Sequence, residues 1–456
     1  MAAQILDVRI ISKESAMPDT TRINPTVPND LDSFWMPFTA SEMFKDNPRL
    51  ISKAQGVRYT TIEGHELLDG TGGLWCCNAG HNHPTITKAI QDQAATLDFV
   101  HNFNQGHPLA FEAASRVTAL APGFDHVFFT NSGSEAVDTA LKIALAYHKT
   151  RGDGDRRILV GREKAYHGIN FGGLSVGGLG LNKGQFGTLY PSTAHMRHTW
   201  LPENTNSRGL PEHGTELADD LQRLCELHGG HTIAAVIVEP VSGAGGVFPP
   251  PVGYLKRLRE ICNVHGILLI FDEVITGFGR MGTPFAFEAF GVQPDIVTCA
   301  KGMTNATVPM GGVLATAGVR DAFRNGPAKM PDLFHGYTYS GHPLASAACI
   351  ATLDAYRDDQ IFENSAAMAA PWEDMLHSLT DISAVMDVRN CGILGAVHLK
   401  QDGAVGDAGR AAYAGLWDAG LIARPVGDAL CLSPPLTITQ DHVNEIGAKL
   451  RAQLQT

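Results

Sequence analysis

The sequence predicts an α/β protein built on a mainly parallel sheet, and its apolar segments carry that prediction. Between about residues 85 and 345, short and uniformly apolar runs alternate with helical patterns. Strands that are apolar along both faces are covered by helices on both faces, which is typical of parallel sheets. The chain has 456 residues, of which 44% are hydrophobic. That is enough for a large core and about two to three domains.

The elements of this domain can be followed in order along the chain. The helix after the first strand begins near Ser134 and carries Val137 and Leu141 four residues apart, and a later helix carries Leu258 and Ile261. These spacings place the side chains on one helical face, where they can pack on a sheet. We therefore expect one large α/β domain over 85–345. Its predicted strands lie at 126–130, 158–160, 233–238, 267–271, 296–299 and 313–314.

The two ends of the chain show different patterns. From 346 to 456, short and partly alternating strands are interleaved with helices, which predicts a smaller α+β domain. Residues 1–84 are expected to form an arm or lobe that joins this domain. The segment 168–184 is rich in glycine and apolar residues, which favours a flexible loop, and a loop of this composition could cover a site. The elements expected in the small domain are strands within 387–399 and at 429–432, and helices at 411–417 and from 441 onward.

Composition and charge exclude several classes of partner. The 35 Lys and Arg residues against 47 Asp and Glu give a net charge of −12, whereas nucleic acids and anionic membranes bind basic surfaces. No run approaches the ~18 apolar residues of a membrane span, and Ile10–Ile11 is too short for a secretory signal. The eight cysteines are scattered, and only Cys76 and Cys77 adjoin, which favours reduced thiols. We therefore expect a soluble, cytoplasmic protein.

Two local patterns resemble binding sites, but each has a simpler explanation. His81 and His83 look like half of a metal site, but no second pair of ligands lies at zinc spacing, so a turn before a helix is favoured and no metal is expected. The glycines of Gly277–Gly282 superficially fit a dinucleotide fingerprint. They follow Asp272 rather than opening the first βαβ unit, so a nicotinamide-dependent oxidoreductase is rejected.

The strand that ends at Thr130 leads into a candidate anion site. Ser132, Gly133 and Ser134 stand where the next helix begins, so backbone N–H groups and hydroxyls are available to a phosphate. The same residues before Glu135 would also serve as an ordinary helix N-cap. Taken alone, this motif leaves both interpretations open.

Charged residues follow two further apolar strands at the same predicted edge of the sheet. Asp272 ends one strand and Lys301 follows the next. A buried ion pair would explain both, because an unpaired buried carboxylate is costly. Pyridoxal phosphate (PLP) would explain them too, since it needs a lysine for its imine, an acid at its ring nitrogen, a phosphate site and side chains that clamp its ring. Tyr166 and Val274 could supply the clamp.

Further motifs extend this pattern along the chain. They are Trp35-Met-Pro-Phe38, Gly73-Leu-Trp-Cys76, Thr130-Asn-Ser-Gly-Ser-Glu135, Ala165-Tyr-His-Gly168, Val238-Glu-Pro240, Phe271-Asp-Glu-Val-Ile-Thr-Gly-Phe-Gly-Arg280, Ala300-Lys301 and His335-Gly-Tyr-Thr-Tyr-Ser340. With these motifs the chain resembles the class III aminotransferases of PLP fold type I, and most of all the ω-amino acid (β-alanine):pyruvate aminotransferases. The resemblance runs from about residue 30 to the end.

The resemblance implies a role for each residue at the cofactor. Lys301 is expected to form the imine with PLP and to shuttle the proton, and Asp272 is expected to hold the pyridinium nitrogen. The remaining contacts expected are Ser132, Gly133 and Ser134 at the phosphate, Tyr166 and Val274 on the two ring faces, His167 beside the cofactor, Glu239 as a carboxylate behind it, and Thr338 from the neighbouring subunit. The active unit would then be at least a homodimer, or a homotetramer, with shared sites.

The resemblance also implies the reaction. Arg424 is expected to receive the carboxylate of the keto-acid acceptor, and Trp75 and Tyr166 to line the substrate pocket. The expected activity is transfer of an amino group from an ω-amino acid or primary amine to pyruvate, in a ping-pong cycle. A preference for taurine or aromatic amines stays open, as does a decarboxylase or aminomutase on the same fold. A PLP-binding protein without turnover is disfavoured by the complete set of Lys301, Asp272 and Arg424.

Overall fold

The computed structural model describes residues 31–187, 189–324 and 330–455. The chain forms two compact units. Of the described residues, the first comprises those up to Lys53 together with Thr60–His65, and it contains α1 (Ser41–Asp46), which buries none of its residues. The second comprises the rest and contains every residue predicted at the site. The apolar pair Ile10–Ile11 lies outside the described residues.

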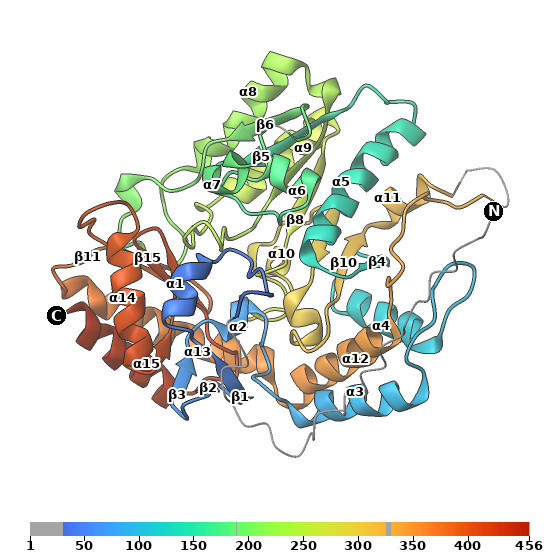
Figure 1. Cartoon of the computed structure of the whole chain (residues 1–456). Helices are drawn as coiled ribbons and strands as arrows, with labels where there is room; N and C mark the ends of the chain where they lie inside the picture. Colours follow the sequence, from blue (N-terminus) through green and yellow to red (C-terminus); the bar gives the residue numbers. More distant parts are fainter. Residues whose placement is uncertain (1–30, 188, 325–329, 456) are drawn as a thin grey trace, which may run out of the picture. The chain divides into compact units, whose positions relative to one another are not determined.

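A seven-stranded sheet runs through the second unit (Figure 1). All its strands are parallel except β10, which is antiparallel to both of its neighbours, so the predicted mainly parallel sheet is confirmed. The chain therefore leaves most of the strands at one shared edge, where open α/β sheets bind ligands. In spatial order the strands are β4 (His126–Thr130), β10 (Gly311–Ala315), β9 (Ile296–Cys299), β8 (Leu268–Asp272), β7 (Ile233–Val238), β5 (Ile158–Arg162) and β6 (Thr193–Met196).

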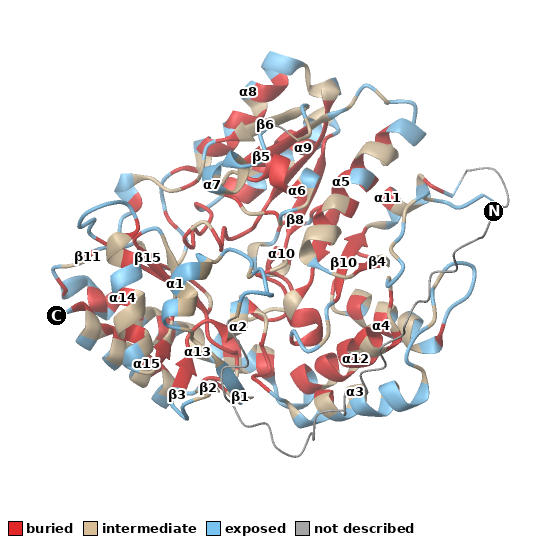
Figure 2. Ribbon diagram, viewed as in Figure 1, coloured by how far each residue is buried: buried red, intermediate tan, exposed pale blue. Residues whose placement is uncertain are grey.

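The two faces of this sheet are covered by different helices, because successive side chains of a strand point to opposite sides. Ile237 and Ile270 belong to the apolar cluster that contains residues of α5 (Gly133–Thr150). Val236 and Leu269 belong to the cluster that contains residues of α8 (Asp219–His228) and α9 (Tyr254–His265). Figure 2 shows the strands between these helices as almost wholly buried, which confirms the expectation from their uniformly apolar sequences.

The C-terminal part of the chain forms a second, antiparallel sheet. Its order is β11 (Val385–Cys391), β12 (Leu394–Leu399), β15 (Ala429–Leu432) and β14 (Arg424–Val426). The helices of this part are α12 (Pro343–Asp358), α13 (Ile361–His377), α14 (Asp407–Asp418) and α15 (Gln440–Leu454). Domain boundaries at 84/85 and 345/346 stay a prediction.

The remaining strands and helices are short. The strands are β1 (Ile51–Gln55) and β2 (Arg58–Thr61), which each have residues in both units, and β3 (Glu66–Asp69), which pairs in parallel with β13 (Leu421–Ile422). The helices are α2 (Gly72–Trp75), α3 (Pro84–Thr96), α4 (Pro108–Ala119), α10 (Ala286–Phe290) and α11 (Ala317–Asp321). As predicted, α3 begins directly after His83. No helix in the described part of the chain is both long and apolar enough to span a membrane.

The glycine-rich segment 168–184 is not an open loop, and that prediction is wrong in part. It contains α6 (Phe171–Val176), whose last four residues are buried, and α7 (Gly180–Gly184). The glycines serve close packing. A Cβ at Gly173 would lie 2.1 Å from the carbonyl oxygen of His167, and a Cβ at Gly178 would lie 2.2 Å from that of Arg162.

Candidate active site

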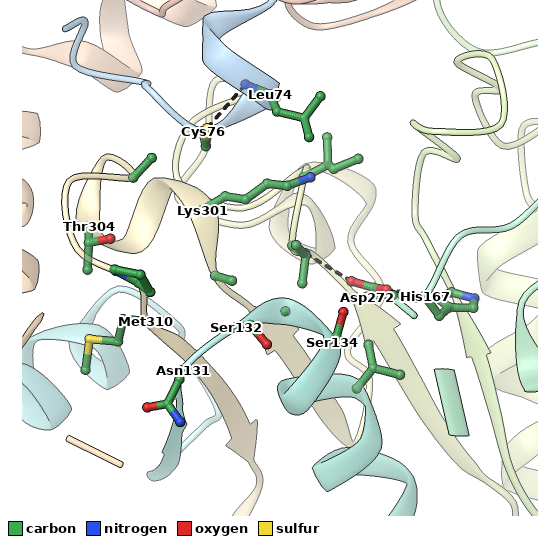
Figure 3. A pocket seen from close by; sticks show the side chains of 18 of the residues that line it. Leu74, Cys76, Asn131, Ser132, Ser134, His167, Asp272, Lys301, Thr304 and Met310 are labelled. Carbon is green, nitrogen blue, oxygen red and sulfur yellow. Dashed lines mark hydrogen bonds and ion pairs between the residues drawn. The ribbon is translucent and has the colours of Figure 1, made fainter. Parts of the chain in front are cut away.

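A cavity of about 370 Å³ lies at the edge of the large sheet where β8 and β9 end. Figure 3 shows Lys301 and Asp272 facing it together with the start of α5. The structure thus brings together most residues predicted at the cofactor. Those that line the cavity are Ser132, Gly133, Ser134, Tyr166, His167, Glu239, Asp272, Val274 and Lys301.

Asp272, the last residue of β8, is a buried carboxylate with a fixed orientation. Its Oδ2 pairs with Nδ1 of His167 at 2.8 Å. Its Oδ1 accepts hydrogen bonds from the Thr298 hydroxyl at 3.1 Å and from the Val274 amide at 3.2 Å. These partners hold the carboxylate at the cavity wall. The alternative interpretation of Asp272 and Lys301, a direct ion pair, is not observed: among the described residues Asp272 pairs with His167 instead.

Glu239, which follows β7, fixes the segment that carries Tyr166. Its carboxylate accepts from the Tyr166 amide at 2.9 Å and from the Gly243 amide at 2.9 Å. Burial is the largest influence on Glu239 and raises its pKa. His167, the next residue after Tyr166, is fully buried, and its Nε2 has no hydrogen-bond partner among the described residues.

Lys301 extends from the turn after β9 into the cavity (Figure 3). Its backbone is left-handed, with φ 47°, which is uncommon for a residue with a side chain and is often found at functional sites. Burial disfavours the charged amine and lowers the pKa of Lys301 to about 8. In the described part of the chain its Nζ has no hydrogen-bond or ion-pair partner, although it lies 5.4 Å from the centre of the Trp75 ring.

The start of α5 satisfies both interpretations of the Ser-Gly-Ser motif. Ser132 is the N-cap, and its hydroxyl accepts a hydrogen bond from the Glu135 amide at 3.1 Å. The amides of Gly133 and Ser134 lie in the first turn, where no intrahelical acceptor exists, so they remain available to an anion in the cavity. A Cβ at Gly133 would lie 2.9 Å from Cγ1 of Val274, so the absence of a side chain keeps this helix start close to the cavity wall.

Trp75 and Arg424 were both predicted on the substrate side of the site, but neither is among the residues that line this cavity. The Trp75 ring is 2% exposed, and the guanidinium carbon of Arg424 lies 5.5 Å from its centre. The Trp75 indole is therefore close to two cationic side chains, Lys301 and Arg424. Arg424 Nε is buried and, within the described residues, has no hydrogen-bond partner.

Thr338 is a third predicted residue, after Trp75 and Arg424, that does not line the cavity of this chain. It is exposed and is absent from the cavity lining. Its expected contribution from a neighbouring subunit stays a prediction.

Several lining residues escaped prediction. Leu74 and Cys76 flank Trp75, and both face the cavity. The segment 304–310 supplies another wall, through Thr304, Ala306, Val308, Pro309 and Met310. Thr298 of β9, a contact of Asp272, also escaped prediction, because a threonine is common in any strand.

Comparison with known proteins gives a consistent answer. The class III aminotransferase profile matches residues 40–454. The chain is 53% identical to an omega-aminotransferase of Caulobacter vibrioides, over 93% of this chain and 98% of that protein. It is 43% identical to the beta-alanine–pyruvate aminotransferase of Pseudomonas aeruginosa, over 94% and 97%.

Solved structures agree with the sequence relatives. An amine transaminase from an uncultivated Pseudomonas species, in its PLP-bound form, superposes with a TM-score of 0.87 at 36% identity, covering 92% of this chain and 98% of that chain. The omega transaminase of Pseudomonas jessenii in complex with PMP gives 0.88 at 31% identity, covering 92% and 95%. The predicted fold type I is therefore confirmed. The cavity at the edge of the sheet and these relatives lead to one conclusion: the chain belongs to the class III aminotransferases.

Proposed function

We propose that this enzyme uses PLP to move an amino group from an ω-amino acid or primary amine to pyruvate. The observation that carries the proposal is the meeting of Lys301, Asp272 and the first turn of α5 around one cavity. The donor and acceptor classes are supported by relatives named omega-aminotransferase, beta-alanine–pyruvate aminotransferase and omega-amino acid–pyruvate aminotransferase.

The residues present fit this cofactor. An aldehyde needs an amine without competing partners, and Lys301 Nζ has none among the described residues. A protonated ring nitrogen needs a fixed carboxylate, and Asp272 is held by three hydrogen bonds. A phosphate needs free N–H donors, which the first turn of α5 supplies.

When bound, PLP withdraws electrons through its protonated ring and carries the amino group between donor and acceptor. Asp272 would hold the proton on the ring nitrogen, while His167 and Thr298 fix its two oxygens. Tyr166 and Val274 would restrict the ring from opposite sides. Because the pKa of Lys301 is lowered to about 8, a useful fraction of this amine is neutral near pH 7–8 and can take a proton from the donor carbon.

On the substrate side, Arg424 would bind the carboxylate of pyruvate, and a guanidinium can do so with two parallel hydrogen bonds. Trp75 would form the wall that separates the amine's substituent from this charge. An Arg424 that serves both an acidic acceptor and an apolar donor would need to swing away. Its Nε has no hydrogen-bond partner among the described residues, which supports that movement.

The active unit is proposed to be a homodimer in which the partner subunit's Thr338 completes the phosphate site. Exposed aromatic side chains near this position support an interface. They are Phe103, Phe334 and Tyr339, which are 51%, 76% and 57% exposed. A cytoplasmic location also stays a prediction.

The proposal can be tested by absorption spectroscopy of the purified, PLP-loaded protein. β-Alanine without acceptor should bleach the band of the bound cofactor, and pyruvate should restore it while alanine forms. A band that responds only to taurine, diamines or aromatic amines would keep the transaminase and change the donor. Bleaching with release of carbon dioxide and no need for a keto acid would indicate a decarboxylase. Failure to bind PLP would overturn the proposal.

A further inference from the structure

One wall of the cavity comes from the segment 71–76, which contains α2 and which we call the wall turn. Two of its residues, Leu74 and Cys76, line the cavity (Figure 3). Its backbone is left-handed at Trp75, with φ 58°, and at the two glycines before Leu74, with φ 55° and 69°. A tryptophan rarely adopts this conformation, so contacts from outside the turn must stabilise it.

The carboxylate of Asp69, the last residue of β3, supplies such contacts. Asp69 is completely buried. Its Oδ1 accepts hydrogen bonds from the amide of Thr71 at 2.9 Å and from the hydroxyl of the same residue at 2.8 Å. Its Oδ2 accepts a hydrogen bond from the amide of Gly73 at 2.6 Å. One carboxylate therefore binds two backbone amides of the wall turn and fixes where the turn begins.

A fourth hydrogen bond to Asp69 comes from His81. The Nε2 of His81 lies 2.7 Å from Asp69 Oδ2, and it donates, because an ionised carboxylate only accepts. Burial disfavours the charged carboxylate, but the hydrogen bonds, led by that of His81, outweigh burial and lower the pKa of Asp69. His81 is itself held in place. The centre of its ring lies 4.2 Å from that of Tyr59, and its backbone exchanges two hydrogen bonds with Gly56.

The two histidines that look like half of a metal site thus have separate partners. His81 pairs with Asp69, whereas His83 Nε2 pairs with Asp359 at 2.8 Å, and the side chain of Asp359 is 51% exposed. Among the described residues, no group of three or more side chains is arranged to hold a metal ion. The pair of His83 and Asp359 makes no hydrogen bond to the wall turn in this part of the chain, so it provides a matched control for the buried pair.

We propose that Asp69 and His81 are positioning residues that hold the wall turn against the cavity and thereby limit the size of the amine donor. This inference rests on the proposed transaminase function. Without the hydrogen bond from His81, a buried carboxylate oxygen loses a partner, and the anchor of the turn is weakened. The wall would then yield to a larger donor. Lys301 and Asp272 would keep their positions, because they follow strands of the large sheet.

Two substitutions at one position test this hydrogen bond. His81→Phe keeps a ring beside Tyr59 and removes the donor, while His81→Gln keeps an N–H group near the position of Nε2. For each PLP-loaded protein, kcat/KM is measured with propylamine and with 1-phenylethylamine, using pyruvate as the acceptor. The ratio of the two values should shift at least about five-fold toward the larger amine in His81→Phe and should stay within about two-fold of the unsubstituted enzyme in His81→Gln.

His83→Phe is the control, because it removes the same kind of donor from the exposed Asp359, and it should leave the ratio unchanged. PLP affinity, measured by titration, should stay within about two-fold in all three variants, since a general loss of folding would lower this affinity and lower kcat/KM for both amines together. An unchanged ratio in His81→Phe, or an equal shift in His83→Phe, would overturn the positioning role and leave the transaminase in place. An unsubstituted enzyme that reacts with neither these amines nor β-alanine would instead overturn the proposed function.

Asp69→Asn is a second, independent variant that serves if His81→Phe does not fold. Its side-chain oxygen can still accept from Thr71, but its NH₂ group then faces the amide of Gly73, where only an acceptor fits. The ratio should shift toward the larger amine, as in His81→Phe. In the double variant the shift should be smaller than the product of the two single shifts, because both substitutions act on one contact. Single shifts that simply multiply would show that the two residues act separately, against the proposal.

Discussion

At the scale of single residues, the hydroxyl of Thr298 matters because it donates a hydrogen bond to Asp272, the carboxylate that would hold the cofactor's ring nitrogen. Thr298→Val keeps the shape of the side chain and removes this donor. A hydrogen bond to a charged group contributes about 1.5–3 kcal/mol, so kcat/KM should fall about ten-fold or more. The measurement is steady-state kinetics with the pH dependence of the bound cofactor's absorption.

Thr298→Ser is the matched control for this change, because it keeps the hydroxyl. It should retain most of the activity and an unshifted absorption profile. Equal losses in the valine and serine variants would show that packing in β9, rather than the hydrogen bond to Asp272, sets the effect.

A second prediction at this scale concerns the pH dependence of Lys301. Burial lowers its pKa to about 8, so the amine of the cofactor-free protein is protonated below that pH and neutral above it. The rate at which it captures an aldehyde should rise through about pH 8 and then level off, whereas an ordinary lysine would continue to gain until about pH 10.4. Stopped-flow mixing with PLP measures this rate, and Lys301→Ala should abolish it. A midpoint near 10 would contradict the lowered pKa.

The same rate profile should respond to Cys76. The negative charge of its thiolate is the leading influence that raises the pKa of Lys301 against the effect of burial. Cys76→Ser removes that charge, so the midpoint should move to lower pH. Cys225→Ser serves as the control, because Cys225 is not among the main influences on the pKa of Lys301. An unchanged midpoint in Cys76→Ser would mean that the two groups are not coupled.

The pattern of apolar residues along the strands decided which site residues could be predicted from the sequence. Asp272 and Lys301 stand out because a charge directly after an apolar strand must reach the sheet edge. Thr298 does not stand out, since a threonine is common in any strand. Cys76 was predicted to be an ordinary thiol. Its direction into the cavity depends on left-handed backbone at neighbouring positions, including Trp75 with φ 58°, and hydrophobic patterns carry no such information.

At the scale of elements, the glycines of 168–184 show how composition can mislead. Gly173→Ala would place a Cβ 2.1 Å from the backbone oxygen of His167, so α6 would have to move away from the residues that contact Glu239 and Asp272. We expect a loss of about 1–3 kcal/mol in the free energy of unfolding, as for other overpacked sites, and weaker PLP binding. Chemical denaturation and PLP titration measure the two effects.

Gly180→Ala, in α7, is the control for that substitution. No atom lies within 4 Å of a Cβ at Gly180. Its replacement should be neutral or slightly stabilising, since alanine favours a helix by about 1 kcal/mol over glycine. If both variants behaved alike, the segment would be a loop that tolerates side chains, as its composition alone had indicated.

The element boundaries themselves were largely predictable, for a physical reason. Strands buried on both faces have continuous apolar sequences, and β4, β7 and β9 have the predicted bounds. The edge strand β6 (Thr193–Met196) escaped prediction, because three of its four residues are only partly buried and its sequence is mixed. The antiparallel direction of β10 was also not predictable, since apolar composition does not encode strand direction.

At the scale of the whole molecule, the proposed homodimer predicts an active site that combines residues of two subunits. Thr338 is exposed and outside the cavity of its own chain, so a shared site would combine Lys301 of one subunit with the partner subunit's Thr338. Lys301→Ala should be inactive, and Thr338→Ala should bind PLP more weakly, through loss of a phosphate hydrogen bond. Dissociating and reassociating the two variants together should create heterodimers with one intact site and one doubly altered site.

This arrangement distinguishes a shared site from two separate ones. If the site is shared, the mixture should gain activity at low PLP concentration, where Thr338→Ala alone is largely unloaded, and the gain should require reassociation. If both residues act within one chain, each heterodimer would hold one inactive and one weakly binding site, so mixing would give no gain over the parent proteins. Size-exclusion chromatography of the mixed sample, followed by PLP titration of the dimer fraction, gives the affinity of the restored site. It should match that of the unsubstituted enzyme.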